Sequence, residues 1–536
     1  MKRKKLAVLL IAVMVLSFGL SACGSDEGGS SSSGGGGQTL IIQDSSWQGV
    51  DMFQCSSWND MQCLMADPIL DRDNETGAPT PCIASEEKWS EDGLTWTLTF
   101  PEGMYYSTGE QVEPEDFIAS VEWGREVSEY AEGYANIESM EVDGRDVIVH
   151  LSEYKADMEW NFMSCFTGLI DKDELDTMSK DELLWGAHPY GPYYLDEYEA
   201  GAYAVLKANE GYKTHNPKVE NKGVMPIKEI RVEFTGEAFT WAEGIQNGEY
   251  DVLTSVPMEY YDELSGNEDI TVVDSASATL SYFEMNMTNP ILSDKNVRLA
   301  IMKGINRDNF SNYLQDIYPP AYSLVVSKCQ NYDPAAEEYF KANYDYDFDA
   351  AVALLEEAGW TDTDGDGFRD KDGQQLALTF SSQDSEPSKS MAQSIQSDMK
   401  ALGINMDITT QEWSYVNQDV VDGNFDLAYL SLGWNEPFLL LDRFCQRNPE
   451  VTNPDPETQE AMVADARSTV DFDERTAKIT EIQKYLMDYA TIVPCLDQGG
   501  YRCWRSEIQG IVHTPTGGFY LADVVTDEDG NFRNVA

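Results

Sequence analysis

Apolar and polar residues alternate strictly in residues 94–100, where leucine, tryptophan and phenylalanine are separated by threonines. A period of two is typical of a half-buried β-strand. The Asp92-Gly93 pair just before this run predicts a tight hairpin turn. Residues 227–234 alternate in the same way, so a further strand is predicted there.

A helical period of three and four follows Asn289-Pro290, whose proline predicts a break in an extended segment. The residues that share the apolar face are Val297, Ala300, Ile301, Gly304 and Ile305. Asp294 is the expected N-cap of this helix. The polar residues expected mostly outside the apolar face are Arg298, Lys303, Arg307 and Asp308.

Strands and helices alternate along the chain. Residues 227–252 predict the order strand, helix, tight turn and strand, and Pro114 is favoured at the first position of another helix. This order is typical of an α/β fold with helices on the faces of a mixed sheet. A chain of 536 residues is also too long for one core, so two or three domains are expected.

The first 22 residues have the pattern of a secretory signal peptide. Residues 2–5 are basic, and residues 6–20 form an uncharged apolar run, shorter than the roughly 20 residues that span a bilayer. Cys23 comes directly after Leu-Ser-Ala, which resembles the lipobox of bacterial lipoproteins and implies diacylation of its thiol. The alternative is an ordinary signal peptide with an accidental cysteine.

Residues 23–38 are rich in glycine and serine, so a flexible tether is expected after Cys23. The chain is also strongly acidic, with 95 Asp and Glu against 36 Lys and Arg and a formal net charge of −59. Binding to nucleic acid needs a basic surface, so no nucleic-acid partner is expected. A solvated acidic surface is the simplest explanation, and it weighs mildly against an anionic solute.

Eight cysteines follow Cys23: Cys55, Cys63, Cys82, Cys165, Cys329, Cys445, Cys495 and Cys503. Their even number permits disulfides, and Cys55/Cys63 and Cys495/Cys503 are the nearest pairs in the sequence. Spacing leaves the connectivity open, and free buried thiols are the alternative. The absence of a C-x-x-C motif and the presence of only four histidines disfavour a zinc site.

Residues 361–373 contain acids in the spacing of a calcium loop. The possible ligands are Asp362, Asp364, Asp366 and Asp370, at positions 1, 3, 5 and 9. Position 12 is Gly373, where an EF-hand needs a glutamate. We interpret the segment as an Asp/Gly-rich turn that needs no cofactor, with weak structural calcium binding as the alternative.

Catalytic motifs are missing from the sequence. It contains no G-x-S-x-G, no H-E-x-x-H and no Walker glycine loop, and no histidine stands beside an obvious nucleophile. Pairs of carboxylates are common in so acidic a chain, but nothing in the sequence distinguishes any pair as catalytic. We therefore expect a binding protein and not an enzyme.

Several ordered blocks resemble one protein family. Residues 285–314 contain Asn-Pro, Val-Arg and Ile-Asn-Arg in the order of the pattern "fN...p.l.d..VR.Ai..aI.R", residues 81–118 contain the Trp and Asp-Gly block, and residues 423–430 contain Gly-x-Phe-Asp. By these blocks the chain resembles the family 5 extracellular solute-binding proteins, the receptors of oligopeptide, dipeptide and nickel ABC importers. The resemblance spans residues 40–524.

This resemblance implies a two-lobe fold of the periplasmic-binding-protein type (type II, cluster C), with an extra subdomain in the first lobe. The expected ranges are 39–58, 187–283 and 491–536 for lobe I, 59–186 for the subdomain and 284–490 for lobe II. The hinge and cleft are expected near residues 282–286. Ligands bind between such lobes when they rotate together.

Aromatic side chains suit the walls of such a cleft, although each is at least as well explained by core packing. The candidate ligand-binding residues are Trp47, Trp58, Tyr282, Trp413, Tyr415, Trp434, Asn435 and Glu436. Peptide-binding members resemble "gW.aDynEP..fL", in which the aspartate pairs with the ligand's ammonium. This chain has Trp434-Asn435-Glu436 without the intervening residues, so either Glu436 supplies the charge or the ligand lacks a free N-terminus.

The sequence thus predicts a substrate-binding lipoprotein that captures peptides or similar solutes for the permease subunits of an ABC importer. It would be a monomer held on the extracellular face of the cell membrane by the lipid on Cys23. A surface receptor for a peptide signal, with the same fold, is one alternative. An extracellular hydrolase is the other, and it is the less favoured.

Overall fold

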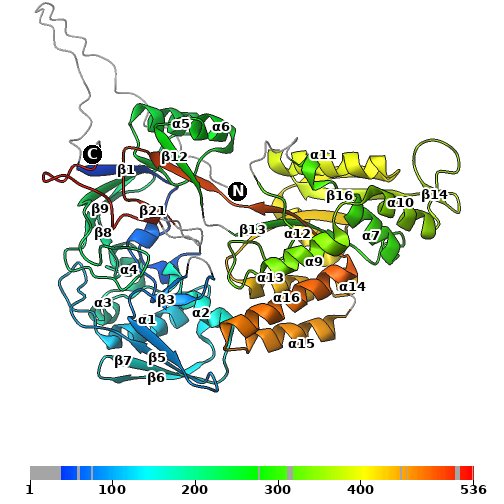
Figure 1. Ribbon diagram of the computed structural model, residues 1–536. Coiled ribbons are helices and arrows are strands. Elements are labelled where there is room, and N and C mark those ends of the chain that lie inside the picture. Colours follow the sequence, from blue (N-terminus) through cyan, green and yellow to red (C-terminus); the bar gives the residue numbers. More distant parts are fainter. Residues whose placement is uncertain are drawn as a thin grey trace, which may run out of the picture. The chain divides into compact units, whose positions relative to one another are not determined.

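The computed structural model describes residues 38–56, 61–73, 76–275, 278–310, 318–446, 449–453, 455–513, 519–533 and 535. Figure 1 shows the chain coloured from blue to red along the sequence. Among the described residues, strands form sheets of seven, five and four strands and three two-stranded sheets. Helices connect many of these strands, which confirms the predicted α/β class.

The seven-stranded sheet has the order β12-β20-β11-β1-β10-β9-β8. Its strands are β1 (Thr39–Gln43), β8 (Tyr193–Glu199), β9 (Tyr203–Ala208), β10 (Glu229–Glu233), β11 (Val252–Leu253), β12 (Ile270–Asp274) and β20 (Tyr501–Arg505). β1 is parallel to both β10 and β11, and its Leu40 and Ile42 are fully buried. The strand predicted in residues 227–234 is confirmed as β10. Helices α5 (Ala238–Asn247) and α6 (Tyr261–Ser265) join strands of this sheet.

The four-stranded sheet has the order β4-β5-β7-β6. Its strands are β4 (Glu86–Trp89), β5 (Thr95–Thr99), β6 (Ile137–Asp143) and β7 (Asp146–Leu151). The predicted hairpin is confirmed: Gly93 has φ +68° in the turn between β4 and β5, and Trp96 is fully buried. Nearby helices are α1 (Pro114–Val127), α2 (Ala156–Phe162), α3 (Lys172–Thr177) and α4 (Lys180–Gly186). The predicted start of α1 at Pro114 is also confirmed.

The five-stranded sheet has the order β17-β16-β18-β13-β19. Its strands are β13 (Thr279–Met285), β16 (Ala377–Gln383), β17 (Asn405–Gln411), β18 (Leu427–Gly433) and β19 (Ile492–Gln498). The helices of this region are α7 (Lys295–Gly304), α9 (Pro334–Tyr344), α10 (Phe348–Glu357), α11 (Glu386–Ala401), α12 (Trp413–Asp422), α13 (Pro437–Gln446), α14 (Pro449–Thr452), α15 (Pro456–Arg467) and α16 (Phe472–Tyr489). The two-stranded sheets pair β2 (Leu70–Arg72) with β3 (Pro79–Pro81), β14 (Asp370–Lys371) with β15 (Gln374–Gln375), and β21 (Val512–His513) with β22 (Phe519–Tyr520).

Two large hydrophobic cores account for most of the buried apolar residues. The first core packs between the seven-stranded and four-stranded sheets and includes Ile42, Trp96 and Trp160. The second core surrounds the five-stranded sheet and includes Tyr282 and Phe444. The division of the chain into two lobes and a subdomain stays a prediction.

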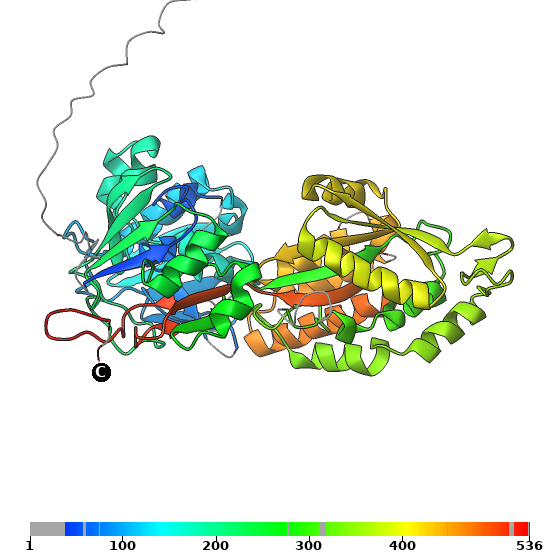
Figure 2. The ribbon, with the colours of Figure 1, turned by 90° about the horizontal axis from the view of Figure 1, so that it is seen from above.

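The chain passes from one large sheet to the other between β12 and β13, and it returns between β19 and β20. These two connections run side by side, since β12 pairs with β20 and β13 pairs with β19 (Figure 2). The first crossing thus lies between Asp274 and Thr279, earlier in the chain than residues 282–286, where the family resemblance implied it. Tyr282 and its neighbours instead pair within the five-stranded sheet.

The predicted amphipathic helix is confirmed as α7, with the Asp294 side chain accepting a hydrogen bond from the backbone N–H of Asn296. The expectation that Arg298 and Arg307 lie outside the buried face is wrong. Arg298 is 5% exposed and donates to the carbonyl oxygens of Leu292 and Tyr489, and Arg307 is 2% exposed. Guanidinium groups enter the interior here because several carbonyl groups converge on them.

Seven cysteines are described, and all are free thiols: Cys55, Cys63, Cys82, Cys165, Cys329, Cys495 and Cys503. Neither pair of neighbouring cysteines is bonded, and Cys495 and Cys503 lie fully buried on different strands, β19 and β20. The side chain of Cys445 and the whole of Cys23 lie outside the described residues. The described thiols therefore fit the alternative of free cysteines packed in apolar surroundings.

A buried ion pair joins α2 of the first core to α16 of the second. The Nη2 atom of Arg475 lies 3.0 Å from Oε2 of Glu159, and both side chains are at most 4% exposed. The hydroxyl of Tyr154 donates to Oε1 of Glu159 and accepts a bond from Arg475. Burial raises the pKa of Glu159, so its charge depends on these donors.

Replacing Arg475 by methionine should lower the free energy of unfolding by about 3–5 kcal/mol, because a buried carboxylate would lose its partner. Urea unfolding followed by tryptophan fluorescence measures this change. The control is Lys88→Met, which breaks an ion pair whose side chains are 73% and 62% exposed and should cost less than about 1 kcal/mol. Equal effects of the two substitutions would contradict the role of the buried pair.

Candidate functional site

A cavity of about 420 Å³ is lined by segments of both cores. The first core contributes residues near Tyr130 and from α2, and the second contributes the end of β18, the start of α13 and the end of α15. Its lining residues are Glu129, Tyr130, Glu132, Gly133, Asn136, Lys155, Asp157, Met158, Trp160, Asn161, Trp434, Glu436, Leu439, Asp442 and Arg467. Cavities of roughly 300–1,000 Å³ are typical of small-molecule sites. We name this space the acidic cavity.

Carboxylates outnumber cations around the acidic cavity. The carboxylates are Glu129, Glu132, Asp157, Glu436 and Asp442, and the cations are Lys155 and Arg467. Arg467 is already engaged, since its Nε lies 3.2 Å from Asp157 and its Nη2 lies 2.5 Å from Asp442. Glu436 is mostly protonated near neutral pH, but the other four carboxylates still outnumber the two cations. This excess of negative charge in a partly enclosed space favours a ligand with a cationic group.

One oxygen of Asp157 is buried without a hydrogen-bond donor among the described residues. Its Oδ2 faces Arg467, whereas its Oδ1 is buried and accepts no hydrogen bond from the described residues. Burial raises the pKa of Asp157, and Arg467 acts against this rise. A buried carboxylate oxygen without a donor is unfavourable, so a donor supplied by a ligand would be stabilised there.

Glu436 lies at the N-terminus of α13 and is 5% exposed. Its Oε2 accepts the backbone N–H of Phe438, and its Oε1 accepts that of Leu439, both at 2.7 Å. The side chain therefore acts as a helix cap, and each oxygen retains one further acceptor position. Burial raises the pKa of Glu436 to about 8, and Asp157 adds to the rise.

Trp434 and Asn435 hold the same edge of the cavity in place. The ring of Trp434 lies 6.0 Å from that of Tyr130, a contact between the two cores. The Oδ1 of Asn435 accepts the backbone N–H of Ala278, which lies next to the crossing between the sheets. Asn435 thus ties the cavity edge to the crossing, while its side chain does not line the cavity.

The other predicted aromatic residues lie elsewhere. Trp47 is 5% exposed, donates to Asp44 and packs on Phe234, and Tyr282 is fully buried against Phe444. Trp413 and Tyr415 lie on α12 and are 41% and 65% exposed. None of these four lines the acidic cavity. Trp58 lies outside the described residues.

Sequence reasoning missed most residues of the acidic cavity, including Tyr130, Asp157, Trp160, Asp442 and Arg467. Asp157 and Trp160 share the short helix α2, and Asp442 and Arg467 lie on α13 and α15. No local spacing connects these elements in the sequence. Acidic and aromatic residues cluster near position 157, but such residues are common throughout this chain, so they do not mark a binding site in the sequence.

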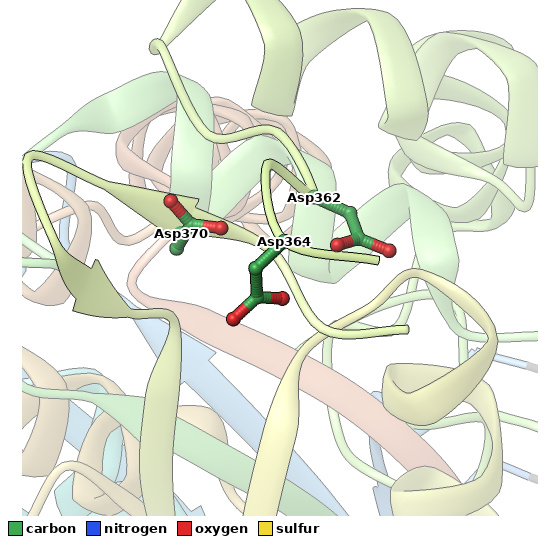
Figure 3. Close-up of side chains that lie close together, drawn as sticks. All are labelled: Asp362, Asp364 and Asp370. Atoms are coloured by element: carbon green, nitrogen blue, oxygen red, sulfur yellow. The ribbon is translucent and has the colours of Figure 1, made fainter. Parts of the chain in front are cut away.

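The calcium-like loop brings three of its four predicted acids together. Possible ligand oxygens of Asp362, Asp364 and Asp370 lie within 4.8 Å of one another, whereas Asp366 is not part of this group. Figure 3 shows the three side chains on one loop and at the start of β14. Their carboxylates already accept bonds from the loop itself, as when Asp362 accepts the backbone N–H groups of Gly365 and Gly367.

Within the described ranges, every helix is too short or too polar to serve as a transmembrane span. The signal and lipidation segment, including Cys23, precedes the first described residue, so those predictions stay untested.

This chain is similar to known solute-binding proteins. A sequence model of bacterial extracellular solute-binding proteins, family 5 (middle), matches residues 78–446. The oligopeptide-binding protein AppA of Bacillus subtilis is 23% identical over 457 residues, which covers 81% of this chain and 82% of that protein. The nickel-binding periplasmic protein of Escherichia coli is 25% identical over 398 residues, covering 70% and 71%.

Solved structures confirm the fold. NikA from Brucella suis in complex with Fe(III)-EDTA has a TM-score of 0.74 at 20% identity, covering 90% of this chain and 99% of that one. The unliganded open form of MppA, a periplasmic murein tripeptide binding protein, has a TM-score of 0.74 at 19% identity, covering 91% and 97%. The predicted periplasmic-binding-protein fold is therefore confirmed. Because the sequence model also matches more than half of the residues, this chain belongs to the family 5 extracellular solute-binding proteins.

Proposed function

We propose that the chain captures a peptide, or a similar small solute with a cationic group, in the acidic cavity and passes it to the permease subunits of an ABC importer. The single observation that carries this proposal is the excess of carboxylates in a 420 Å³ cavity lined by both cores. Membership of a solute-binding family supports the transport role. In this proposal the ligand leaves unchanged, so the protein is not an enzyme.

The acidic cavity offers two acceptors for an ammonium group. Oδ1 of Asp157 has no hydrogen-bond donor among the described residues, and Glu436 keeps further acceptor positions beyond its helix cap. An ammonium group carries three donors, so it can engage both carboxylates. We propose that these two residues take the role of the aspartate that peptide-binding relatives have and this chain lacks.

We further propose that the protein is a monomer, held at the extracellular face of the cell membrane by the lipid on Cys23. The basic and apolar segments before Cys23 support export, and two acyl chains give stable anchoring where one is marginal. The glycine- and serine-rich tether then gives the binding domain freedom to reach a permease in the same membrane.

Glu436→Gln should weaken the binding of free-amine tripeptides by about 10- to 100-fold, because a charge-assisted contact would be lost. The pKa of Glu436 is about 8, so at pH 7 the group is mostly protonated before binding. A bound ammonium favours the carboxylate form and lowers this pKa, so binding should release roughly one proton. Calorimetry in buffers of different ionisation enthalpy measures both quantities.

N-acetylated tripeptides, which lack the cationic amine, should bind Glu436→Gln and the unchanged protein alike. The matched control is Asp347→Asn, which removes a carboxylate from the cap of α10, away from the acidic cavity. It should leave both affinity and proton release unchanged. Unaltered affinity of Glu436→Gln for the free-amine peptides would overturn the role of Glu436.

For the loop at residues 361–373 we propose an Asp/Gly-rich turn that folds without a bound ion. The hydrogen bonds that its aspartates accept from the loop backbone support this proposal, as does the Thr363 hydroxyl, which donates to Asp370. The melting temperature should therefore change by less than about 1 °C between 1 mM calcium and excess chelator. A clear rise with calcium that Asp362→Asn abolishes would favour the calcium alternative instead.

A further inference from the structure

A second, smaller cavity of about 110 Å³ lies beside β2 and β22. Its apolar wall includes Met163, Val219, Met225 and Phe519, and its charged lining residues are Asp67, Asp71 and Arg72. Trp160 lines this space and the acidic cavity alike. The smaller cavity therefore shares Trp160 with the acidic cavity and has Arg72 in its own lining.

The guanidinium of Arg72 is buried without a close ion pair or a hydrogen bond among the described residues. Arg72 is 7% exposed, and its guanidinium carbon lies 4.8 Å from the centre of the Trp160 ring. Among the described residues, none accepts a hydrogen bond from this side chain or forms an ion pair with it. A buried arginine remains charged, so the lack of a counter-ion is costly. The stacking on Trp160 compensates only a part of that cost.

The two nearby carboxylates are engaged elsewhere. Asp71 forms an ion pair with Lys218 at 3.0 Å, and it also accepts bonds from Asn216 and Tyr520. Asp67 accepts the hydroxyl of Tyr212 at 2.6 Å, and burial raises its pKa to about 7, so it carries only part of a charge at neutral pH. Asp71 favours the charged form of Arg72, but neither Asp71 nor Asp67 accepts a hydrogen bond from the Arg72 guanidinium.

We propose that Arg72 and Trp160 form a subsite for a carboxylate group of the captured solute. A carboxylate accepts two parallel hydrogen bonds from a guanidinium, and the Trp160 ring lies close beside the Arg72 guanidinium. This inference rests on the proposed function, because it adds a second recognition point to the ligand that the acidic cavity captures. It also names the ligand class: a zwitterion with an ammonium group and a carboxylate.

The dimensions fit one end of a ligand. A space of about 110 Å³ holds a carboxylate with a small apolar group, and the acidic cavity of about 420 Å³ holds the remainder. The strongly acidic surface of the protein disfavours anions in general. A single buried arginine would therefore select molecules that carry their negative charge at one defined place.

The test compares ligands that differ only in the carboxylate. The whole chain is titrated with a mixture of free-acid tripeptides and with the same tripeptides as C-terminal amides. The unchanged protein should bind the acids about 10- to 100-fold more tightly, and Arg72→Met should remove this preference while it leaves the binding of the amides unchanged. Arg231→Met is the matched control, because Arg231 stacks on Tyr203 at 3.9 Å but lines neither cavity.

A second probe needs no peptide. 3-Phenylpropionate should shift the indole N–H signal of Trp160 in NMR spectra of the 15N-tryptophan-labelled chain, and 3-phenylpropionamide should not. A shift that is present in the unchanged protein and absent in Arg72→Met supports the carboxylate subsite, even if no tripeptide binds. The failure of all tripeptides to bind would overturn only the proposed capture of peptides. The subsite is overturned if the free-acid tripeptides bind no more tightly than their amides and 3-phenylpropionate shifts the Trp160 signal no more than 3-phenylpropionamide does.

Discussion

The ion pair between Glu159 and Arg475 is the contact on which the site depends. It connects α2 in the first core to α16 in the second, in surroundings where both side chains are at most 4% exposed. The same short helix carries Asp157 and Trp160, which line the acidic cavity. A buried charge without its partner is strongly unfavourable, so the pair holds α2 in one position and orients the site residues with it.

The distribution of charge fits the proposed recognition of a zwitterion by this acidic protein. The acidic cavity gathers carboxylates, two of which are used to hold Arg467. The smaller cavity, which also has Trp160 in its lining, contains the guanidinium of Arg72, which forms no hydrogen bond or close ion pair with the described residues. Low exposure strengthens both attractions relative to water, and each buried group remains costly until a ligand supplies the opposite charge. Selectivity would then come from the spacing of two charges as well as from shape.

The sequence predicted the fold more fully than the site. The alternation around Trp96 and the apolar face of α7 depend on neighbouring residues, so local patterns were sufficient for them. The burial of Arg298 and Arg307 was not predictable in this way, because the carbonyl groups that accept their hydrogen bonds include Tyr489 and Pro494, far along the chain. The same limit applies to Glu159 and Arg475, which are 316 residues apart in the sequence. Glu436 was found from a family motif, and its role as a helix cap came only with the structure.

The most direct test of capture without chemistry is native mass spectrometry of the protein purified from its own cell envelope. We predict one bound solute per chain, with a free amino group and a carboxylate, whose mass stays the same after prolonged incubation with the protein. A bound solute that lacks either charged group, or one that the protein hydrolyses, would contradict this prediction.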